Sequence, residues 1–195
     1  MKAATLTDSK EQGLILGAFY YGYVVTQIPG GFLAEKYGSK LLCGLGVLCT
    51  SVLTLLTPLA AEGGVALLVV CKVLSGFGEG MAYPALYAMF SKWLVLSERS
   101  KFITFIESGA QVGTVVSLSI SGVLAAYISW QSVFYFCGVL GCIWFVFWVL
   151  LVFNTPQAHP RICSHELDYI ANNIIRTRNE KLPSPPMRYY LKLIV

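Results

Sequence analysis

The hydrophobic positions of this 195-residue chain fall into five long apolar stretches that are separated by short polar segments. A transmembrane helix needs about 20 consecutive, predominantly apolar residues, and each stretch is long enough to provide them. The pattern therefore predicts an all-α, polytopic helical membrane protein, with five spanning helices inside residues 14–153. The predicted spans are about residues 14–34, 41–61, 65–90, 102–127 and 132–153.

The composition supports a membrane protein and excludes an ordinary soluble domain. Hydrophobic residues make up 56% of the chain and charged residues only 12%, whereas soluble domains carry about 25% charged residues. The net charge of +4 does not indicate a nucleic-acid partner, because most of the basic residues lie on one side of the predicted membrane spans. We expect a lipid bilayer as the surroundings of this chain.

The basic residues are concentrated on one side of the predicted bundle. Eleven of the fourteen lie in the first loop, in the third loop and after the last span. The positive-inside rule therefore places the tail, residues 154–195, in the cytosol and residues 1–13 on the extracytosolic side. An N-terminus on that side with no span before it suggests that a helix is missing upstream.

The tail contains a second kind of helical pattern. Apolar residues recur at helical spacing between polar ones over residues 165–178, and acidic side chains precede basic ones. This arrangement predicts an amphipathic helix that lies on the cytosolic surface. Its apolar positions are Leu167, Ile170, Ala171, Ile174 and Ile175.

Two ionisable residues of opposite sign lie deep in the third apolar stretch. Lys72 and Glu79 are seven residues apart, which is nearly two helical turns, so both side chains point to one face, about 10 Å apart along the axis. A charge at the centre of a bilayer costs about 2.5 to 3.5 kcal/mol, so this face is expected to line a bundle interior or a wet cavity. The pattern favours an anion beside Lys72 and proton exchange at Glu79, although partners on other helices would explain both charges equally well. Glu107 is a further possible site residue, or one that reaches the cytosolic interface.

Pairs of glycines four residues apart occur in three of the stretches. Small residues at this spacing let helix backbones approach closely. The pairs are Gly13 and Gly17, Gly76 and Gly80, and Gly109 and Gly113. We expect each pair to mark a helix–helix contact.

The first loop carries a motif that resembles one found between the second and third helices of major facilitator superfamily transporters. It reads Gly31-Phe-Leu-Ala-Glu-Lys-Tyr-Gly-Ser-Lys40 here, against a family pattern of roughly G-x-L-A-D-R-x-G-R-K. Longer strings are similar to the anion:cation symporter family within that superfamily. They include Gly22-Tyr-Val-Val-Thr-Gln-Ile-Pro-Gly-Gly31, Gly76-Phe-Gly-Glu-Gly-Met-Ala-Tyr-Pro-Ala85 and Trp130-Gln-Ser-Val-Phe-Tyr135.

The resemblance implies a major facilitator fold, in which the five spans correspond to helices two to six of twelve. It implies that Lys72, where the family usually has Arg, and Tyr83 bind the substrate, and that Glu79 couples transport to protons. It also implies a conformational role for part of the first-loop motif. Those residues are Gly31, Glu35, Lys36, Gly38 and Lys40.

The function expected from these observations is secondary active transport of a small organic or inorganic anion by alternating access. The anion would be of the acidic-sugar, dicarboxylate or glutamate, or phosphate type, the coupling ion a proton or sodium, and the membrane lysosomal, vesicular or plasma. On this interpretation the chain is an incomplete half that needs the missing transporter helices. The alternative is a truncated, non-transporting isoform that acts only through a full-length partner.

An enzyme is not expected from this sequence. Both histidines, His159 and His165, follow the last span, and no nucleophile or metal-ligand constellation is visible. We therefore predict no cofactor and no metal, and we expect the histidines to be solvated.

Overall fold

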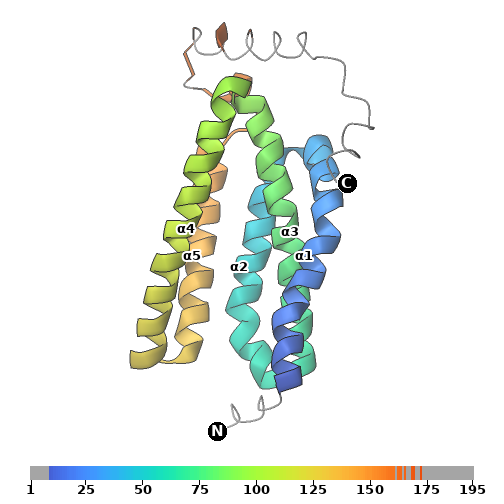
Figure 1. Ribbon diagram of the computed structural model, residues 1–195, viewed down its shortest axis with the longest axis vertical. Helices are drawn as coiled ribbons and strands as arrows, with labels where there is room; N and C mark the ends of the chain where they lie inside the picture. Colours follow the sequence, from blue (N-terminus) through green and yellow to red (C-terminus); the bar gives the residue numbers. More distant parts are fainter. Residues whose placement is uncertain (1–8, 161, 164, 166–167, 170–171, 173–195) are drawn as a thin grey trace, which may run out of the picture.

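The computed structural model describes residues 9–160, 162–163, 165, 168–169 and 172. Within these residues the chain forms five long α-helices and one short 3-10 turn, with no β-strand, which confirms the all-α fold (Figure 1). The helices run side by side along the long axis of the molecule. They are α1 (Ser9–Tyr37), α2 (Ser39–Gly63), α3 (Val65–Trp93), α4 (Leu96–Tyr127) and α5 (Trp130–Leu151), followed by the turn η2 (Pro156–Ala158).

Two glycines separate the first three helices. Gly38 lies between α1 and α2 with φ at 98°, and Gly64 lies between α2 and α3 with φ at 111°. Side chains with a Cβ atom rarely adopt such positive φ values, so glycine is the residue that permits these one-residue breaks. The helices extend beyond most of the predicted spans because a helix continues into polar flanks, whereas α5 ends at Leu151, two residues before the predicted boundary.

Four of the helices are long and apolar enough to cross a membrane in the described part of the chain. They are α2, α3, residues 98–127 of α4, and α5. The 29-residue α1 is long enough, but glycines, tyrosines, Gln27 and Pro29 dilute its apolar character. That α1 also crosses the membrane stays a prediction.

The helix α3 is the centre of the packed bundle. It packs against α1 on one side and α2 on another, α2 in turn packs against α5, and α4 packs mainly on α5. Figure 1 accordingly shows α4 and α5 as a pair beside the group of α1, α2 and α3. The apolar stretch of α4 contains no buried residue, so lipid or further protein is needed to cover it.

Glycines bring the backbones of α1 and α3 close together. A Cβ atom added at Gly76 would lie 2.9 Å from the backbone nitrogen of Tyr23, and one added at Gly80 would lie 3.0 Å from the Cα atom of Tyr23. The prediction of a close helix contact is therefore confirmed for Gly76 and Gly80. By contrast, a Cβ atom added at Gly13, Gly109 or Gly113 would meet no atom of another helix within 4 Å among the described residues, and the neighbour found for Gly17 is Tyr21 in its own helix. The prediction of a helix–helix contact is therefore wrong for these two pairs within the described chain.

Beyond α5 the described chain ends in a compact turn. The ring of His159 is half-buried between two aromatic rings, at 6.0 Å from Trp93 and 4.9 Å from Phe153, so the prediction that this histidine is solvated is wrong. Most of the predicted amphipathic helix, 165–178, lies outside the described residues, as do residues 1–8 of the predicted extracytosolic segment. These assignments stay predictions.

Candidate functional site

Lys72 lies in the third turn of α3 and points toward α5. Its Nζ atom is 5.6 Å from the centre of the Phe134 ring, and the side chain is half-buried. A cation over the face of an aromatic ring is attracted by the ring's quadrupole. The ring therefore holds the ammonium group without neutralising its charge.

Glu79 lines a cavity of about 200 Å³ between α2, α3 and α5. Gly78, its neighbour in α3, approaches α2 so closely that an added Cβ atom would lie 2.8 Å from the carbonyl oxygen of Gly46. This close approach brings Glu79 within reach of the hydroxyl-bearing face of α2. The other residues that line the cavity are Val47, Thr50, Ser51, Thr54 and Cys137.

The structure brings Lys72 and Glu79 to the same side of α3 but does not join them. Lys72 contacts Phe134, and Glu79 shares its cavity with Cys137, one turn further along α5. Within the described part of the chain neither side chain has an ion-pair or hydrogen-bond partner. An anion beside Lys72 and a cation beside Glu79 could consequently be held at once, about two helical turns apart.

Glu107 is held across the gap between α3 and α4. The hydroxyl of Tyr87 donates a hydrogen bond of 3.2 Å to Glu107 Oε1, and the Arg99 guanidinium donates one of 3.4 Å to the carbonyl oxygen of Tyr87. Tyr83, with 40% of its surface exposed, lies on α3 one helical turn from Glu79 and one turn from Tyr87, the hydrogen-bond partner of Glu107.

Part of the first-loop motif is bonded to the end of α5, and part of it is exposed. The backbone N–H of Lys40 donates to Asn154 Oδ1 at 2.8 Å, and its Nζ atom donates to the carbonyl oxygen of Val149 at 2.7 Å. Gly38 packs against the same asparagine, since an added Cβ atom would lie 3.0 Å from Asn154 Nδ2. These contacts fasten the start of α2 to the end of α5.

The other charged residues of the motif take no part in this attachment. Glu35 and Lys36 are exposed, and the contact found for Lys36 is with the neighbouring ring of Tyr37, at 5.5 Å. Gly31 makes ordinary contact with Pro84 on α3, at 3.7 Å from an added Cβ atom. Glu35 and Lys36 therefore remain available for contacts outside the described residues.

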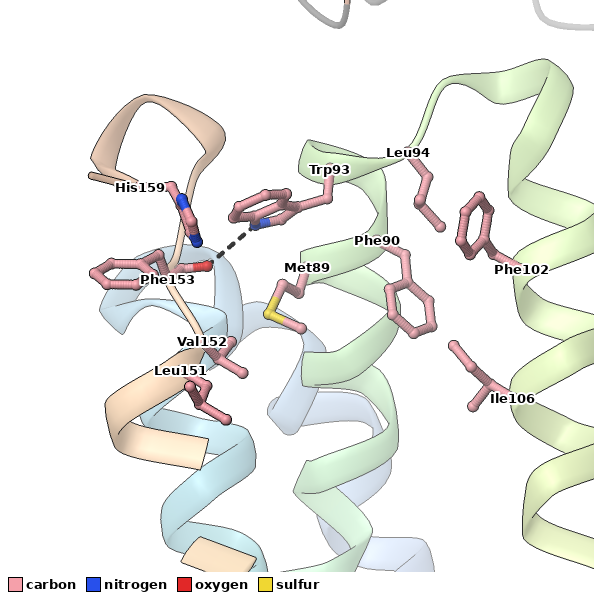
Figure 2. Close-up of a pocket in the computed structure, with 10 residues that line it drawn as sticks. All are labelled: Met89, Phe90, Trp93, Leu94, Phe102, Ile106, Leu151, Val152, Phe153 and His159. Carbon is pink, nitrogen blue, oxygen red and sulfur yellow. Dashed lines mark hydrogen bonds between the residues drawn. The ribbon is translucent and has the colours of Figure 1, made fainter. Parts of the chain in front are cut away.

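A second cavity, of about 310 Å³, lies at the end of the bundle that carries Trp93 and Phe153 (Figure 2). Its walls are almost wholly apolar and come from α3, α4 and the end of α5. The indole N–H of Trp93 donates to the carbonyl oxygen of Phe153 at 3.1 Å and closes one side of it. Such walls suit hydrocarbon rather than a small anion.

Three groups in and around these sites could not be assigned from the sequence. In the sequence, the hydroxyl residues of α2 are ordinary polar residues of a membrane helix, and only the packing of α3 brings Glu79 beside them. Asn154 follows the last span, and nothing in the sequence connects it to the first loop. The sequence gives one weak indication of Tyr87: it lies four residues after Tyr83 and eight after Glu79, so the three side chains share one face of a helix. No group of three or more His, Cys, Asp or Glu side chains lies close enough to hold a metal ion among the described residues.

A bundle of membrane-length helices with unpaired charges at depth defines a polytopic membrane protein with an interior polar site. The chain belongs to the major facilitator superfamily, whose family pattern matches residues 1–189. This match confirms the resemblance drawn from the first-loop motif.

The similar proteins include two sialins and a vesicular glutamate transporter. Sialin from Ovis aries and sialin from Homo sapiens are each 50% identical over 167 residues, covering 86% of this chain and 34% of the relative. Vesicular glutamate transporter 3 from Danio rerio is 38% identical over 193 residues, covering 96% of this chain and 33% of the relative. The chain therefore spans about a third of the length of these relatives.

The resemblance to sialin could already be drawn from three sequence strings. They are Gln12-Gly-Leu-Ile-Leu-Gly-Ala-Phe-Tyr-Tyr-Gly22, Gly109-Ala-Gln-Val-Gly-Thr114 and Asn154-Thr-Pro-Gln157. The identity of 50% to both sialins confirms this sialin-like character.

Proposed function

We propose that this chain is part of a secondary active transporter of small organic or inorganic anions, coupled to protons or sodium and working by alternating access. One observation carries the proposal: Lys72 and Glu79 face the same side of α3, half-buried and unpaired within the described residues. Unpaired charges at such depth are costly unless they serve a ligand. The relatives support transport and give no support to an enzymatic activity.

Each charge takes a different role in this proposal. Lys72 attracts the anionic group of the substrate, and Tyr83, one turn from Glu79, offers a hydroxyl to its polar atoms. Glu79 takes up the coupling cation, and Glu107 is a further possible member of the site. The site would lie near the bilayer midplane, where two halves of a transporter rock about the substrate.

The substrate would be an acidic sugar, glutamate or another dicarboxylate, or phosphate. The membrane would be lysosomal, vesicular or plasma, with the C-terminal tail in the cytosol because most basic residues lie at that end. The remaining helices of the transporter would come from parts of the protein outside this chain.

The experiment that tests this function is uptake into proteoliposomes that contain the full-length protein. Radiolabelled glutamate, phosphate and an acidic monosaccharide are offered separately under an inward proton gradient, an inward sodium gradient and no gradient. We expect saturable accumulation of at least one anion under one gradient. Accumulation no greater than in empty liposomes for all three anions would contradict the proposal.

A further inference from the structure

The cavity beside Glu79 has an unusual wall of hydroxyl groups. Thr50, Ser51 and Thr54 all lie on one face of α2, at the helical spacing i, i+1 and i+4, and all three line the cavity with Glu79. Gly141 lets α5 come close to this face, because an added Cβ atom would lie 3.0 Å from Ser51 Cβ. The cavity thus lies between three helices and has one carboxylate in its lining.

The protons of these hydroxyls are already committed to the backbone of α2. Thr50 Oγ1 donates to the carbonyl oxygen of Gly46 at 3.0 Å, Ser51 Oγ to that of Val47 at 2.7 Å, and Thr54 Oγ1 to that of Thr50 at 2.8 Å. A hydroxyl has one proton to donate and two lone pairs to accept with. Each oxygen therefore keeps lone pairs with which it can accept a further bond.

A carboxylate and three acceptor oxygens form a ligand set for a hard cation. We propose that this cavity binds a sodium ion between Glu79 and the hydroxyl oxygens of Thr50, Ser51 and Thr54. Hard cations take oxygen ligands, and calcium and magnesium sites draw mainly on several carboxylates, phosphates or retained waters. A single carboxylate balances a single positive charge, so the site suits a monovalent ion.

The other groups that face the cavity do not disturb this assignment. Cys137 on α5 is a soft sulfur donor that does not compete for a hard ion. The carbonyl oxygen of Ser75 on α3, outside the lining, is a second acceptor for the Thr50 hydroxyl, at 3.2 Å. The nearest cation on α3 is Lys72, two turns away, where the ring of Phe134 holds it at 5.6 Å. A proton on Glu79 would compete with sodium for the same carboxylate.

The inference deepens the proposed function and rests on Glu79 as its coupling residue. Sodium bound in this cavity neutralises Glu79 and leaves the charge of Lys72 uncompensated. An anion beside Lys72 would then be attracted more strongly when sodium is present. Occupation of the two sites would be linked, as coupled transport requires.

The test measures binding of radioactive sodium to the purified full-length protein, with Glu79→Gln, Thr54→Val and Thr114→Val variants. Thr114 is the matched control: its hydroxyl makes the same kind of bond, to Ala110 at 3.0 Å, but lies on exposed α4 outside the cavity. We expect saturable binding by the native protein and by Thr114→Val, and none by Glu79→Gln. Thr54→Val should bind at least about tenfold more weakly, since even outer-shell partners of a metal contribute about 10-fold to 100-fold in affinity.

The proposal is overturned if the monodisperse native protein shows no saturable sodium binding, or if Thr54→Val binds sodium as tightly as Thr114→Val. Folding of every variant is checked by gel filtration, and Thr54→Val keeps the shape of the side chain that it replaces. Failure of this inference is distinct from failure of the proposed function. A protein that accumulates anions under a proton gradient but binds no sodium would keep the function and lose the sodium site.

Discussion

Lys72 is the only basic residue within the five apolar stretches of the sequence. It is half-buried, lies over the ring of Phe134 and has no carboxylate partner in the described part of the chain. A buried cation in this setting is stabilised most by an anion that arrives from outside. Substitution of Lys72 therefore tests anion binding directly.

We predict that Lys72→Gln weakens binding of the transported anion by at least about tenfold, because a hydrogen bond to a charged group contributes about 1.5 to 3 kcal/mol. Lys72→Arg should preserve binding, since it keeps the charge. Equilibrium binding of the radiolabelled anion to the full-length protein is the measurement, and Lys101→Gln, at the exposed start of α4, is the control. Normal affinity in Lys72→Gln would mean that the binding charge comes from another residue.

At the residue scale the sequence indicated the charged residues of the site but not their neighbours. Lys72 and Glu79 stand out because charges are rare in apolar stretches, and helical spacing alone puts them on one face. Thr50, Ser51 and Thr54 do not stand out, since hydroxyls in membrane helices commonly bond to their own backbone. Their role depends on the packing of α2 against α3, which no local pattern expresses.

Small residues determine how closely α1 and α3 pack against each other. Gly76 and Gly80 allow contact between backbones, and this contact fixes the helix that carries Lys72 and Glu79. Loss of the contact would displace both side chains together.

We predict that Gly76→Ala destabilises the folded protein by about 1 to 3 kcal/mol, because its methyl group would be forced against the backbone of Tyr23. The matched control is Gly109→Ala on α4, where the methyl group meets no atom of another helix within 4 Å among the described residues. That control should be neutral or slightly stabilising, since alanine favours a helix by up to about 1 kcal/mol over glycine. Thermal unfolding of the full-length protein in detergent measures both, and equal stability of the two variants would refute the packing argument.

Each long helix overlaps one apolar stretch of the sequence, because apolar length is a local property. The neighbours of each helix depend on packing and could not be predicted. The pairs Gly76/Gly80 and Gly109/Gly113 have the same spacing, yet only the first lies in a contact between described helices. In α4 nearly all faces are exposed, so the periodicity of its sequence does not identify a partner. The link from Lys40 to Asn154 was hidden for a similar reason, because the two residues are 114 positions apart.

At the scale of the whole molecule, the first-loop motif combines an attachment with free charges. Lys40 fixes the start of α2 to the end of α5, whereas Glu35 and Lys36 are exposed. Alternating access requires contacts that exist in one state and break in the other. Exposed charges at the end of a helix can make such contacts at little cost.

We predict that Glu35→Ala in the full-length protein slows turnover severalfold and leaves the half-saturating anion concentration nearly unchanged. A residue that serves the conformational change affects the rate of the cycle more than the binding of substrate. Initial rates of uptake over a range of anion concentrations separate the two effects, with Glu62→Ala at the exposed other end of α2 as the control. Unchanged turnover in Glu35→Ala would exclude a role for this carboxylate in the cycle.

The proposed transport cycle depends on Glu79 to link the movement of a cation to the movement of an anion. One measurement tests it: proteoliposomes with native protein or Glu79→Gln are assayed both for gradient-driven accumulation of the anion and for its exchange without a gradient. We expect Glu79→Gln to lose gradient-driven accumulation but still to exchange anion across the membrane. Gradient-driven accumulation at the native level in Glu79→Gln would contradict this expectation.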